Sequence, residues 1–292
     1  MQTWLVTGCS SGLGRAIAEA ALSAGARVAA TARRVESVAE LAQQGSGRCL
    51  PVALDVADPA SVKAAVLAAE EWAGGIDVLV NNAGFGLYGA VEEVEDEEIR
   101  DVFETNILGV ARMVRAVLPG MRQRGRGTIV NIGSVAGLVG GPGNAFYAAS
   151  KFAVEAISEA MHAELRPLGI RTILIEPSGI RTDFHGRSYK RAARRIADYE
   201  QTAGKQIAFN LSLNGRQAGD PRRMAATILR LVASENPPFR LLLGASCVER
   251  VRAKLTGMLD DIERWEEVSG AVDFANPEFP ADRPLPSAAP QK

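Results

Sequence analysis

The strongest constraint on the fold is a glycine-rich turn close to the N-terminus. Residues 3–7 have the composition of a buried strand, and Gly8-Cys-Ser-Ser-Gly-Leu-Gly14 leads into an alanine-rich helix that should end near Gly25. Glycines permit a tight turn and a close approach to a pyrophosphate, whose charge is favoured at a helix N-terminus. The spacing of the glycines is G-x-x-x-G-x-G and not G-x-G-x-x-G. The alternative to a dinucleotide site is a glycine-rich turn that binds no ligand. We expect a dinucleotide to contact Gly8, Ser10, Ser11, Gly12, Leu13 and Gly14.

Strand-like and helix-like segments alternate along most of the chain. Seven apolar runs have strand character: 3–7, 27–31, 48–54, 76–80, 127–134, 170–175 and 239–243. Helical patterns cover 59–73, 96–121, 146–166, 221–234 and about 246–266. The alternation predicts an α/β fold, a single doubly wound (Rossmann) domain with a seven-stranded parallel sheet and helices on both faces. We expect residues 1–271 to form this domain and the proline- and alanine-rich residues 272–292 to form a poorly ordered tail.

Composition narrows the class of protein. With 23% charged and 47% hydrophobic residues and a net charge of −1, the chain has no electrostatic basis for binding nucleic acid or an anionic membrane. No apolar run approaches the roughly 20 residues that span a bilayer, and Met1 leads into a strand without a basic leader, so secretion is not expected. Cys9, Cys49 and Cys247 are few and far apart, which predicts reduced thiols, a cytoplasmic location and no metal site.

The end of the second strand carries information on the nucleotide. Folds that prefer NAD place an acidic residue about 20 residues beyond the glycines, where it binds the ribose 2′-hydroxyl. This chain has Ala32 there, followed by Arg33 and Arg34. A guanidinium binds a 2′-phosphate that a carboxylate would repel, so the sequence predicts NADP(H) in preference to NAD(H). The alternative is that one of the two arginines is only a solvated residue at the start of a helix. We assign this alternative to Arg34 first and to Arg33 second.

A second constellation lies in residues 127–166. The strand 127–134 ends on Ser134, and the next helix carries Tyr147 and Lys151 on one face. A phenolate at neutral pH needs the pKa of Tyr147 to fall by about 3 units, or ~4 kcal/mol, which one ammonium at about 4 Å supplies. We expect Lys151 to lower this pKa, Tyr147 to act as general acid–base and Ser134 to hold a substrate oxygen. Alone, the Tyr-x-x-x-Lys pair fits an ordinary helix surface equally well.

Taken together, these motifs resemble those of the short-chain dehydrogenases/reductases. The resemblance covers about residues 2–250 and rests on motifs in the family's order: Thr7 to Gly14, Asp55, Asn81-Asn-Ala-Gly84, Asn106, Ser134, Tyr147-x-x-x-Lys151 and Pro177-x-Gly-x-x-Thr182. It implies a catalytic tetrad of Asn106, Ser134, Tyr147 and Lys151. It also implies that Lys151 binds the nicotinamide ribose and that Asn106 relays protons to it through a water. Ser178 is the one departure, and its effect should be small.

The resemblance further implies which residues meet the cofactor. Asp55 would contact the adenine amino group, and Asn82 and Ala83 would line the adenosine ribose. The carboxamide would meet Ile180 and Thr182. Beyond the glycine-rich turn, the expected cofactor residues are Arg33, Arg34, Asp55, Val56, Asn82, Ala83, Gly84, Tyr147, Lys151, Pro177, Gly179, Ile180 and Thr182. Asp55 at a strand end is also a common turn residue, and Asn106 within a helix is commonly a packing residue.

Residues 178–219 are long for a connection, which predicts a substrate lid with its own helix, near 189–202. We expect a mostly apolar pocket for a bulky hydrophobic ketone or alcohol, as in the hydroxysteroid and retinol dehydrogenase branches that this chain resembles. The expected substrate residues are Ser134, Tyr147, Phe85, Leu87, Tyr88, Leu138, Phe184 and His185. The basic run 187–195 is interpreted as a solvated helix face, with a site for a carboxylate or phosphate as the alternative.

The leading hypothesis is an NADP(H)-dependent carbonyl reductase or alcohol dehydrogenase that acts on a small-molecule carbonyl or alcohol without a metal. A non-catalytic dinucleotide sensor or scaffold on the same fold is one alternative, and an epimerase or dehydratase of the same family is another. Helices 96–121 and 146–166 are apolar on more than one face, so we expect a homodimer or homotetramer built on them.

Overall fold

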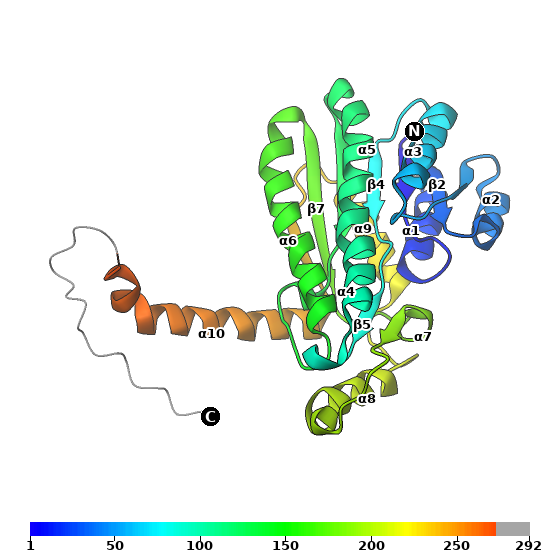
Figure 1. Cartoon of the computed structure of the whole chain (residues 1–292). Coiled ribbons are helices and arrows are strands. Elements are labelled where there is room, and N and C mark those ends of the chain that lie inside the picture. Colours follow the sequence, from blue (N-terminus) through cyan, green and yellow to red (C-terminus); the bar gives the residue numbers. More distant parts are fainter. Residues whose placement is uncertain (273–292) are drawn as a thin grey trace.

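Residues 1–272 are described by the structure, a computed structural model, except for the side chains of His185 and Arg187. The tail predicted from residue 272 therefore lies, from residue 273 onward, outside the described residues. Helices surround a central sheet, as Figure 1 shows. The helices are α1 (Gly12–Ser23), α2 (Ala39–Gly45), α3 (Pro59–Ala73), α4 (Asp96–Phe103), α5 (Gly109–Arg124), α6 (Ala145–Leu165), α7 (Phe184–Arg187), α8 (Lys205–Ser212), α9 (Pro221–Ala233) and α10 (Ala245–Gly270).

The central sheet has seven parallel strands, which confirms the predicted doubly wound fold. Its strands are β1 (Thr3–Val6), β2 (Arg27–Ala32), β3 (Cys49–Ala53), β4 (Val78–Asn81), β6 (Gly127–Ile132), β7 (Ile170–Pro177) and β9 (Arg240–Leu243). They run in the order β3-β2-β1-β4-β6-β7-β9. The order reverses between β1 and β4, and such a reversal opens a crevice at the carboxyl ends of the strands.

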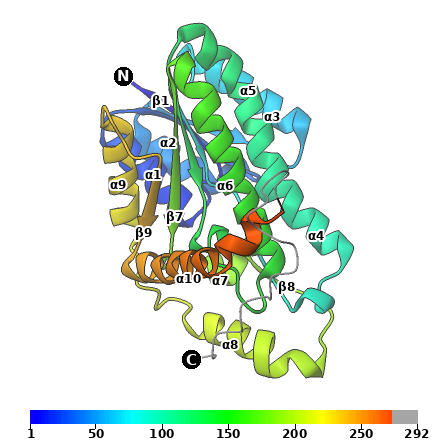
Figure 2. The same ribbon diagram turned by 90° about the vertical axis from the view of Figure 1, so that its left-hand side faces the viewer.

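Alternate strand residues point to opposite faces, and helices cover both (Figure 2). Val6, Val28 and Val130 pack with α1, α2 and α9 in one core. Leu5 and Leu79 point the other way and pack with α3, α5 and α6 in a second core. The sheet is thus buried on both faces, which accounts for its nearly continuous apolar runs.

Local signals set the ends of the surrounding helices. The side chain of Asp58 accepts a hydrogen bond from the N–H of Ala60 at 2.9 Å, and Pro59 is the first residue of α3. The same helix ends at Gly74 in the left-handed conformation, with φ 76°. Asp220 and Pro221 begin α9 in the same manner. These caps explain why both helices fall where the sequence predicts them.

Two predicted helices differ from the structure. The helix predicted over 96–121 is interrupted by a π-helical turn, Glu104–Leu108, between α4 and α5. The lid helix predicted near 189–202 is wrong: residues 189–191 form strand β8, and the lid helix is α8, further along the chain. Strand β8 pairs in parallel with β5 (Gly86–Tyr88), a short strand that the sequence analysis missed. Backbone pairing across about 100 residues overrides local helix preference here.

The buried face of β4 offers a test of the second core. Leu79 is fully buried at the centre of that core, whereas Leu67 on α3 is 52% exposed. We expect Leu79→Ala to lower the free energy of unfolding by about 2–5 kcal/mol, because it removes buried methyl groups and leaves a cavity. Urea unfolding would measure the change, with Leu67→Ala as a control that shifts stability by less than about 0.5 kcal/mol. Equal effects of the two substitutions would contradict this packing.

Candidate active site

The glycine-rich turn joins β1 to α1 at the crevice. Gly8 and Gly12 have φ values of +74° and +64°, which side-chain-bearing residues rarely adopt. A Cβ on Gly14 would lie 2.4 Å from the carbonyl oxygen of Gly8 and 2.3 Å from Nδ2 of Asn82. No side chain fits at that distance, so the spacing of the three glycines follows from backbone geometry.

Asn82 holds this turn in place. Its Nδ2 donates hydrogen bonds to the carbonyl oxygens of Thr7 at 2.9 Å and Gly8 at 3.2 Å. In return, Oγ1 of Thr7 accepts from the N–H groups of Asn82 and Ala83, both at 2.9 Å. The side chain of Asn82 therefore joins the end of β4 to the end of β1, a role that sequence analysis missed, and the ribose contact expected of it stays a prediction.

The first turn of α1 is suited to an anion. Ser11 precedes the helix and makes no side-chain cap, and the first N–H groups of a helix have no partner within it. Ser10 and Ser11 are half-buried at this end, whereas Leu13 is buried in the core and faces away from the solvent. These free donors and the open backbone at Gly12 fit a pyrophosphate.

Arg33 and Arg34 follow β2 at the same edge of the sheet, and both are exposed. Neither guanidinium has an ion-pair partner within residues 1–272, so both are available to an anionic ligand. On the neighbouring strand end, Oδ1 of Asp55 accepts from the N–H of Ala57 at 3.0 Å, which is the behaviour of a turn residue. Val56 is buried in the second core.

The structure brings Ser134, Tyr147 and Lys151 together behind the crevice. All three are buried, with relative exposures of 9%, 8% and 7%. The hydroxyl of Ser134 lies close enough to that of Tyr147 to influence its ionisation, and Oγ of Ser134 accepts from the N–H of Ala136 at 3.1 Å. Nζ of Lys151 donates to the carbonyl oxygen of Ile132 at 2.8 Å. Strand β6 and helix α6 thus supply the hydroxyl pair and the amine.

The expected direction of the pKa shift of Tyr147 is wrong for this structure. Burial of the phenol raises its pKa, and the hydrogen bond from Ser134 offsets the rise only in part. Burial also lowers the pKa of Lys151 to about 8, although the carboxylate of Glu155 opposes the change. The sequence argument considered attraction between the two groups and left out the cost of burying them.

Asn106 lies in the π-helical turn and is 1% exposed. Its Oδ1 accepts from the N–H of Phe85 at 3.1 Å, and its Nδ2 donates to the carbonyl oxygen of Phe85 at 2.9 Å and to Ser150 at 3.0 Å. A Cβ on Gly84 would lie 2.9 Å from this Oδ1 and 3.9 Å from Nζ of Lys151. Asn106 therefore fixes the loop after β4 against α6, and π-helical turns of this kind are frequent at functional sites.

The segment after β7 closes one side of the crevice. Pro177 ends the strand, and Ile180 forms an isolated bridge with Gly219, at the far end of the predicted lid. A Cβ on Gly12 would lie 3.3 Å from Cβ of Thr182, so Thr182 lies directly against the glycine-rich turn. Gly179 lies between these two anchor points. The expected carboxamide residues are thus next to the expected pyrophosphate site.

Aromatic rings gather around Tyr147. The ring centroid of Tyr88 is 5.9 Å from that of Tyr147, and that of Phe184 is 6.0 Å from it. Tyr189 of β8 stacks on Tyr88 at 3.7 Å. Two other expected substrate residues lie elsewhere: Leu87 is buried on the opposite side of β5 from Tyr88, and Leu138 packs with the start of α10.

The remaining substrate candidates lie at the edges of this cluster. Phe85 is half-buried, with Nζ of Lys190 4.4 Å above its ring. His185 belongs to α7, and its side chain lies outside the described residues.

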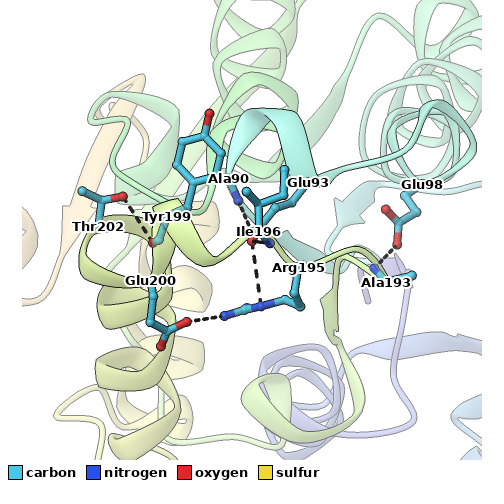
Figure 3. Close-up of polar contacts among 9 residues, drawn as sticks. All are labelled: Ala90, Glu93, Glu98, Ala193, Arg195, Ile196, Tyr199, Glu200 and Thr202. Carbon is cyan, nitrogen blue, oxygen red and sulfur yellow. Dashed lines mark hydrogen bonds and ion pairs between the residues drawn. The ribbon is translucent and has the colours of Figure 1, made fainter.

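Glu93 attaches the lid to the body, as Figure 3 shows. Its carboxylate is 2% exposed and accepts from the N–H groups of Ala90 at 2.8 Å and Ile196 at 2.9 Å. Burial opposes its ionisation, but these hydrogen bonds and Arg195 hold its pKa below the ordinary value. Further along, Glu98 accepts from the N–H of Ala193 at 3.1 Å.

The basic run 187–195 is not the helix face that we expected from the sequence. After α7 it forms β8 and an irregular segment. Arg195 forms ion pairs with Glu93 at 3.9 Å and with Glu200 at 3.0 Å, and Lys190 pairs with Asp101 at 3.4 Å. Carboxylates of this chain therefore account for these cations, and the run holds the lid in place.

A buried carboxyl pair behind Lys151 was also missed. Glu155, one turn further along α6, and Glu176 of β7 are 5% and 0% exposed, and each influences the ionisation of the other. Arg240 of β9 forms ion pairs with Glu155 at 2.8 Å and with Glu176 at 3.2 Å. Burial and the neighbouring Glu155 raise the pKa of Glu176 to about 8. A charged residue inside an otherwise apolar strand pattern, such as Glu176, was the available signal.

The structure gives two further findings. No helix in residues 1–272 combines the length and the apolar character needed to cross a bilayer. Over the same residues, no three His, Cys, Asp or Glu side chains gather as a metal site would require.

This chain has a Rossmann-type fold: a parallel sheet with a glycine-rich β1–α1 turn and free donors at a helix N-terminus, the arrangement on which such folds bind dinucleotides. The sequence model of the family described as short chain dehydrogenase matches residues 2–193. The chain belongs to this family of oxidoreductases.

Relatives in the family span most of the chain. The oxidoreductase BOA17 of Botryotinia fuckeliana is 38% identical, over 91% of this chain and 97% of its own length. A 3-ketodihydrosphingosine reductase of Bacteroides thetaiotaomicron is 36% identical, over 89% of this chain and 94% of its own. Retinol dehydrogenase 8 of Homo sapiens is 35% identical, over 82% of this chain and 80% of its own length.

Solved structures agree with the fold. A short-chain dehydrogenase from Streptomyces avermitilis matches with a TM-score of 0.87 and 38% identity, over 94% of this chain and all of its own. One from Burkholderia phymatum, in complex with NAD, matches at 0.76 and 27% identity, over 94% and 97%. An alcohol dehydrogenase from Thermococcus sibiricus, complexed with 5-hydroxy-NADP, matches at 0.69 and 25% identity, over 83% and 96%.

The carboxyl pair gives a pH-dependent stability. Because the pKa of Glu176 is about 8 in the folded chain against an ordinary 4.5, the folded state binds more protons than the unfolded state between these values. Stability should therefore fall as pH rises from about 5 to 8, by up to about 1.4 kcal/mol per unit. Glu176→Gln should remove the part of this slope that belongs to Glu176, because an amide does not ionise. Urea unfolding of both proteins at several pH values measures the difference, and identical slopes would contradict it.

Proposed function

We propose that this protein is an NADP(H)-dependent oxidoreductase that interconverts a ketone or aldehyde and an alcohol, with a bulky hydrophobic carbonyl compound as substrate. The observation that carries the proposal is the buried Ser134–Tyr147 hydroxyl pair with Lys151 one turn away on α6. These groups lie at the carboxyl end of a sheet whose β1–α1 turn fits a pyrophosphate.

The chain's own residues supply the proton and the orientation. A nicotinamide bound in the crevice supplies hydride chemistry. Ser134 donates a hydrogen bond to the substrate oxygen and fixes its position. Tyr147, whose raised pKa keeps it protonated at neutral pH, delivers its proton to the oxygen as that oxygen becomes an alkoxide. Lys151, with a pKa of about 8, exchanges protons near neutrality and resupplies the site. Asn106 keeps the loop after β4 and α6 in register around these groups.

Several residues would hold the nicotinamide dinucleotide. The pyrophosphate would meet the first N–H groups of α1, beside Gly12. The nicotinamide end would lie between Thr182, which packs against Gly12, and Lys151, near Gly84. At the adenosine end, Arg33 would bind the 2′-phosphate, because Ala32 and not a carboxylate ends β2 and the guanidinium has no ion pair within residues 1–272.

The substrate class follows from the rings around Tyr147 and from the relatives. Tyr88, Phe184 and Tyr189 form a mostly apolar wall, which suits a large hydrophobic molecule. The names of the sphingosine-type reductase and of retinol dehydrogenase 8 describe substrates with long apolar chains. The proposal also places the protein in the cytoplasm. Its three cysteines are buried free thiols, the form that is usual in that reducing compartment.

Removal of the phenol hydroxyl tests the chemistry. We expect Tyr147→Phe to lower kcat by a factor of at least about 1,000, since the proton donor is lost, while NADPH affinity stays within a few-fold. Oxidation of NADPH with a panel of ketones, steroids and retinoids measures the first quantity, and NADPH fluorescence the second. Turnover close to that of the natural chain would refute the assignment. Tyr199→Phe is the matched control, because Tyr199 lies in the lid and bonds to Glu92.

A second variant tests the choice of nucleotide. Arg33→Ala should weaken NADPH binding by about 10- to 100-fold, the loss of one charge-assisted phosphate contact, and leave NADH binding nearly unchanged. Titration of both nucleotides into both proteins measures this, with Arg27→Ala, at the opposite end of β2, as a control. Tighter binding of NADH than NADPH by the natural chain would overturn the predicted preference.

A further inference from the structure

Helix α10 leaves the body of the protein. It has 26 residues and is about 39 Å long, and within it only Cys247 and Val251, near its start, are buried. Figures 1 and 2 show its later turns extending past α6, away from the sheet. Helical stability in proteins comes mainly from packing of an apolar face, so a long projecting helix needs a partner.

The apolar face of α10 continues beyond its contact with the body. Val251 packs on Val135, whereas apolar residues before and after it on the same side are exposed. We call these exposed residues the α10 stripe: Val248 (38%), Leu255 (50%), Met258 (46%), Leu259 (59%) and Ile262 (59%). With Val251 and without Leu259, they recur at alternating intervals of three and four residues, the repeat by which helices pair along their length; Leu259 adjoins Met258.

The charges of α10 oppose those that stabilise a lone helix. Acidic residues are favourable near a helix N-terminus and basic ones near the C-terminus. Here the N-terminal half carries Arg250, Arg252 and Lys254 against one acidic residue, Glu249. Residues 260–267 instead hold five acidic residues and one basic residue, Arg264. Gly257, in the middle, lowers helix propensity by about 1 kcal/mol relative to alanine. Neither charge nor propensity explains a helix of this length.

We propose that the α10 stripe is the dimer interface of this protein, with a second copy of α10 packed antiparallel to it. In an antiparallel pair, the basic half of each helix lies beside the acidic half of the other, and the two helix dipoles also oppose each other. A parallel pair would instead place like charges together at both ends. The same surface patch serves both copies, as a two-fold dimer requires.

This interface would reach the active site. The start of α10 packs on Val135, the residue after Ser134, and on Leu138 of the following loop. In the antiparallel pair, the acidic end of the second α10 lies near this start, and so it borders the loop that follows Ser134. It also differs from the interface on helices 96–121 and 146–166 that the sequence predicts.

The test measures the association of the full-length chain by sedimentation velocity over a range of concentrations. The natural chain should be a dimer, and the double variant Leu255→Glu/Ile262→Glu should weaken association by on the order of 100-fold or more, because it charges the centre of the interface. Glutamate is a good helix former, so circular dichroism should show the helix retained. Leu67→Glu, at an exposed leucine of α3, is the matched control.

Charge reversal tests the antiparallel direction. Lys254→Glu alone and Asp261→Lys alone should each weaken the dimer about 3- to 10-fold, and the two together should restore it. The two positions are two turns apart in one helix, so they do not pair within a chain.

Three results would overturn the proposal. The first is a natural chain that is monomeric. The second is a dimer that the double variant does not weaken, since its interface would lie elsewhere, and the third is a pair of charge reversals that do not compensate each other. Flotation with vesicles of uncharged and of anionic phospholipid tests whether the α10 stripe binds a membrane surface instead of a second copy. A monomer that binds vesicles, and loses binding in the double variant, would assign the stripe to a membrane surface and refute self-association.

Discussion

The parallel pairing of β1, β4, β6 and β7 is the constraint on which the rest of the structure depends. All four strands end at one edge of the sheet, so Thr7, the loop after Asn81, Ser134 and the segment after Pro177 meet there although up to 170 residues separate them. The hydrogen bonds between Thr7 and Asn82 join two of these ends directly. Helix α6 follows β6 and begins at this end of the sheet, and its first two turns carry Tyr147 and Lys151.

The site is built from ionisable groups that are held out of water. Tyr147, Lys151, Glu155 and Glu176 are all nearly buried, and burial is the largest influence on the pKa of each. Such groups persist because each has a partner: Ser134 for Tyr147, the carbonyl of Ile132 for Lys151, and Arg240 for the two carboxyls. A protonated phenol beside an amine with a pKa of about 8 suits proton delivery in the reductive direction.

Two segments outside the sheet, the lid and helix α10, lie next to the candidate site. The lid is held by Glu93 and Glu98, acidic residues that bond to backbone N–H groups of 193–196, and β8 adds to β5. Both contacts link residues about 100 positions apart. Helix α10 touches the loop after Ser134 at its start and extends outward from there. Lid and α10 thus border the same candidate catalytic residues from different sides.

The amino-acid sequence by itself determined the seven-stranded parallel sheet, because apolar periodicity and the glycine-rich turn are local properties, and the order of the motifs singled out Ser134, Tyr147 and Lys151. It did not determine the path of the lid, the role of Asn82 or the pKa of Tyr147. Those depend on backbone pairing across long separations and on desolvation, which exist only once the chain has folded. Tertiary structure alone decided that Glu155, Glu176 and Arg240, scattered over 86 residues, share one buried cluster behind the amine.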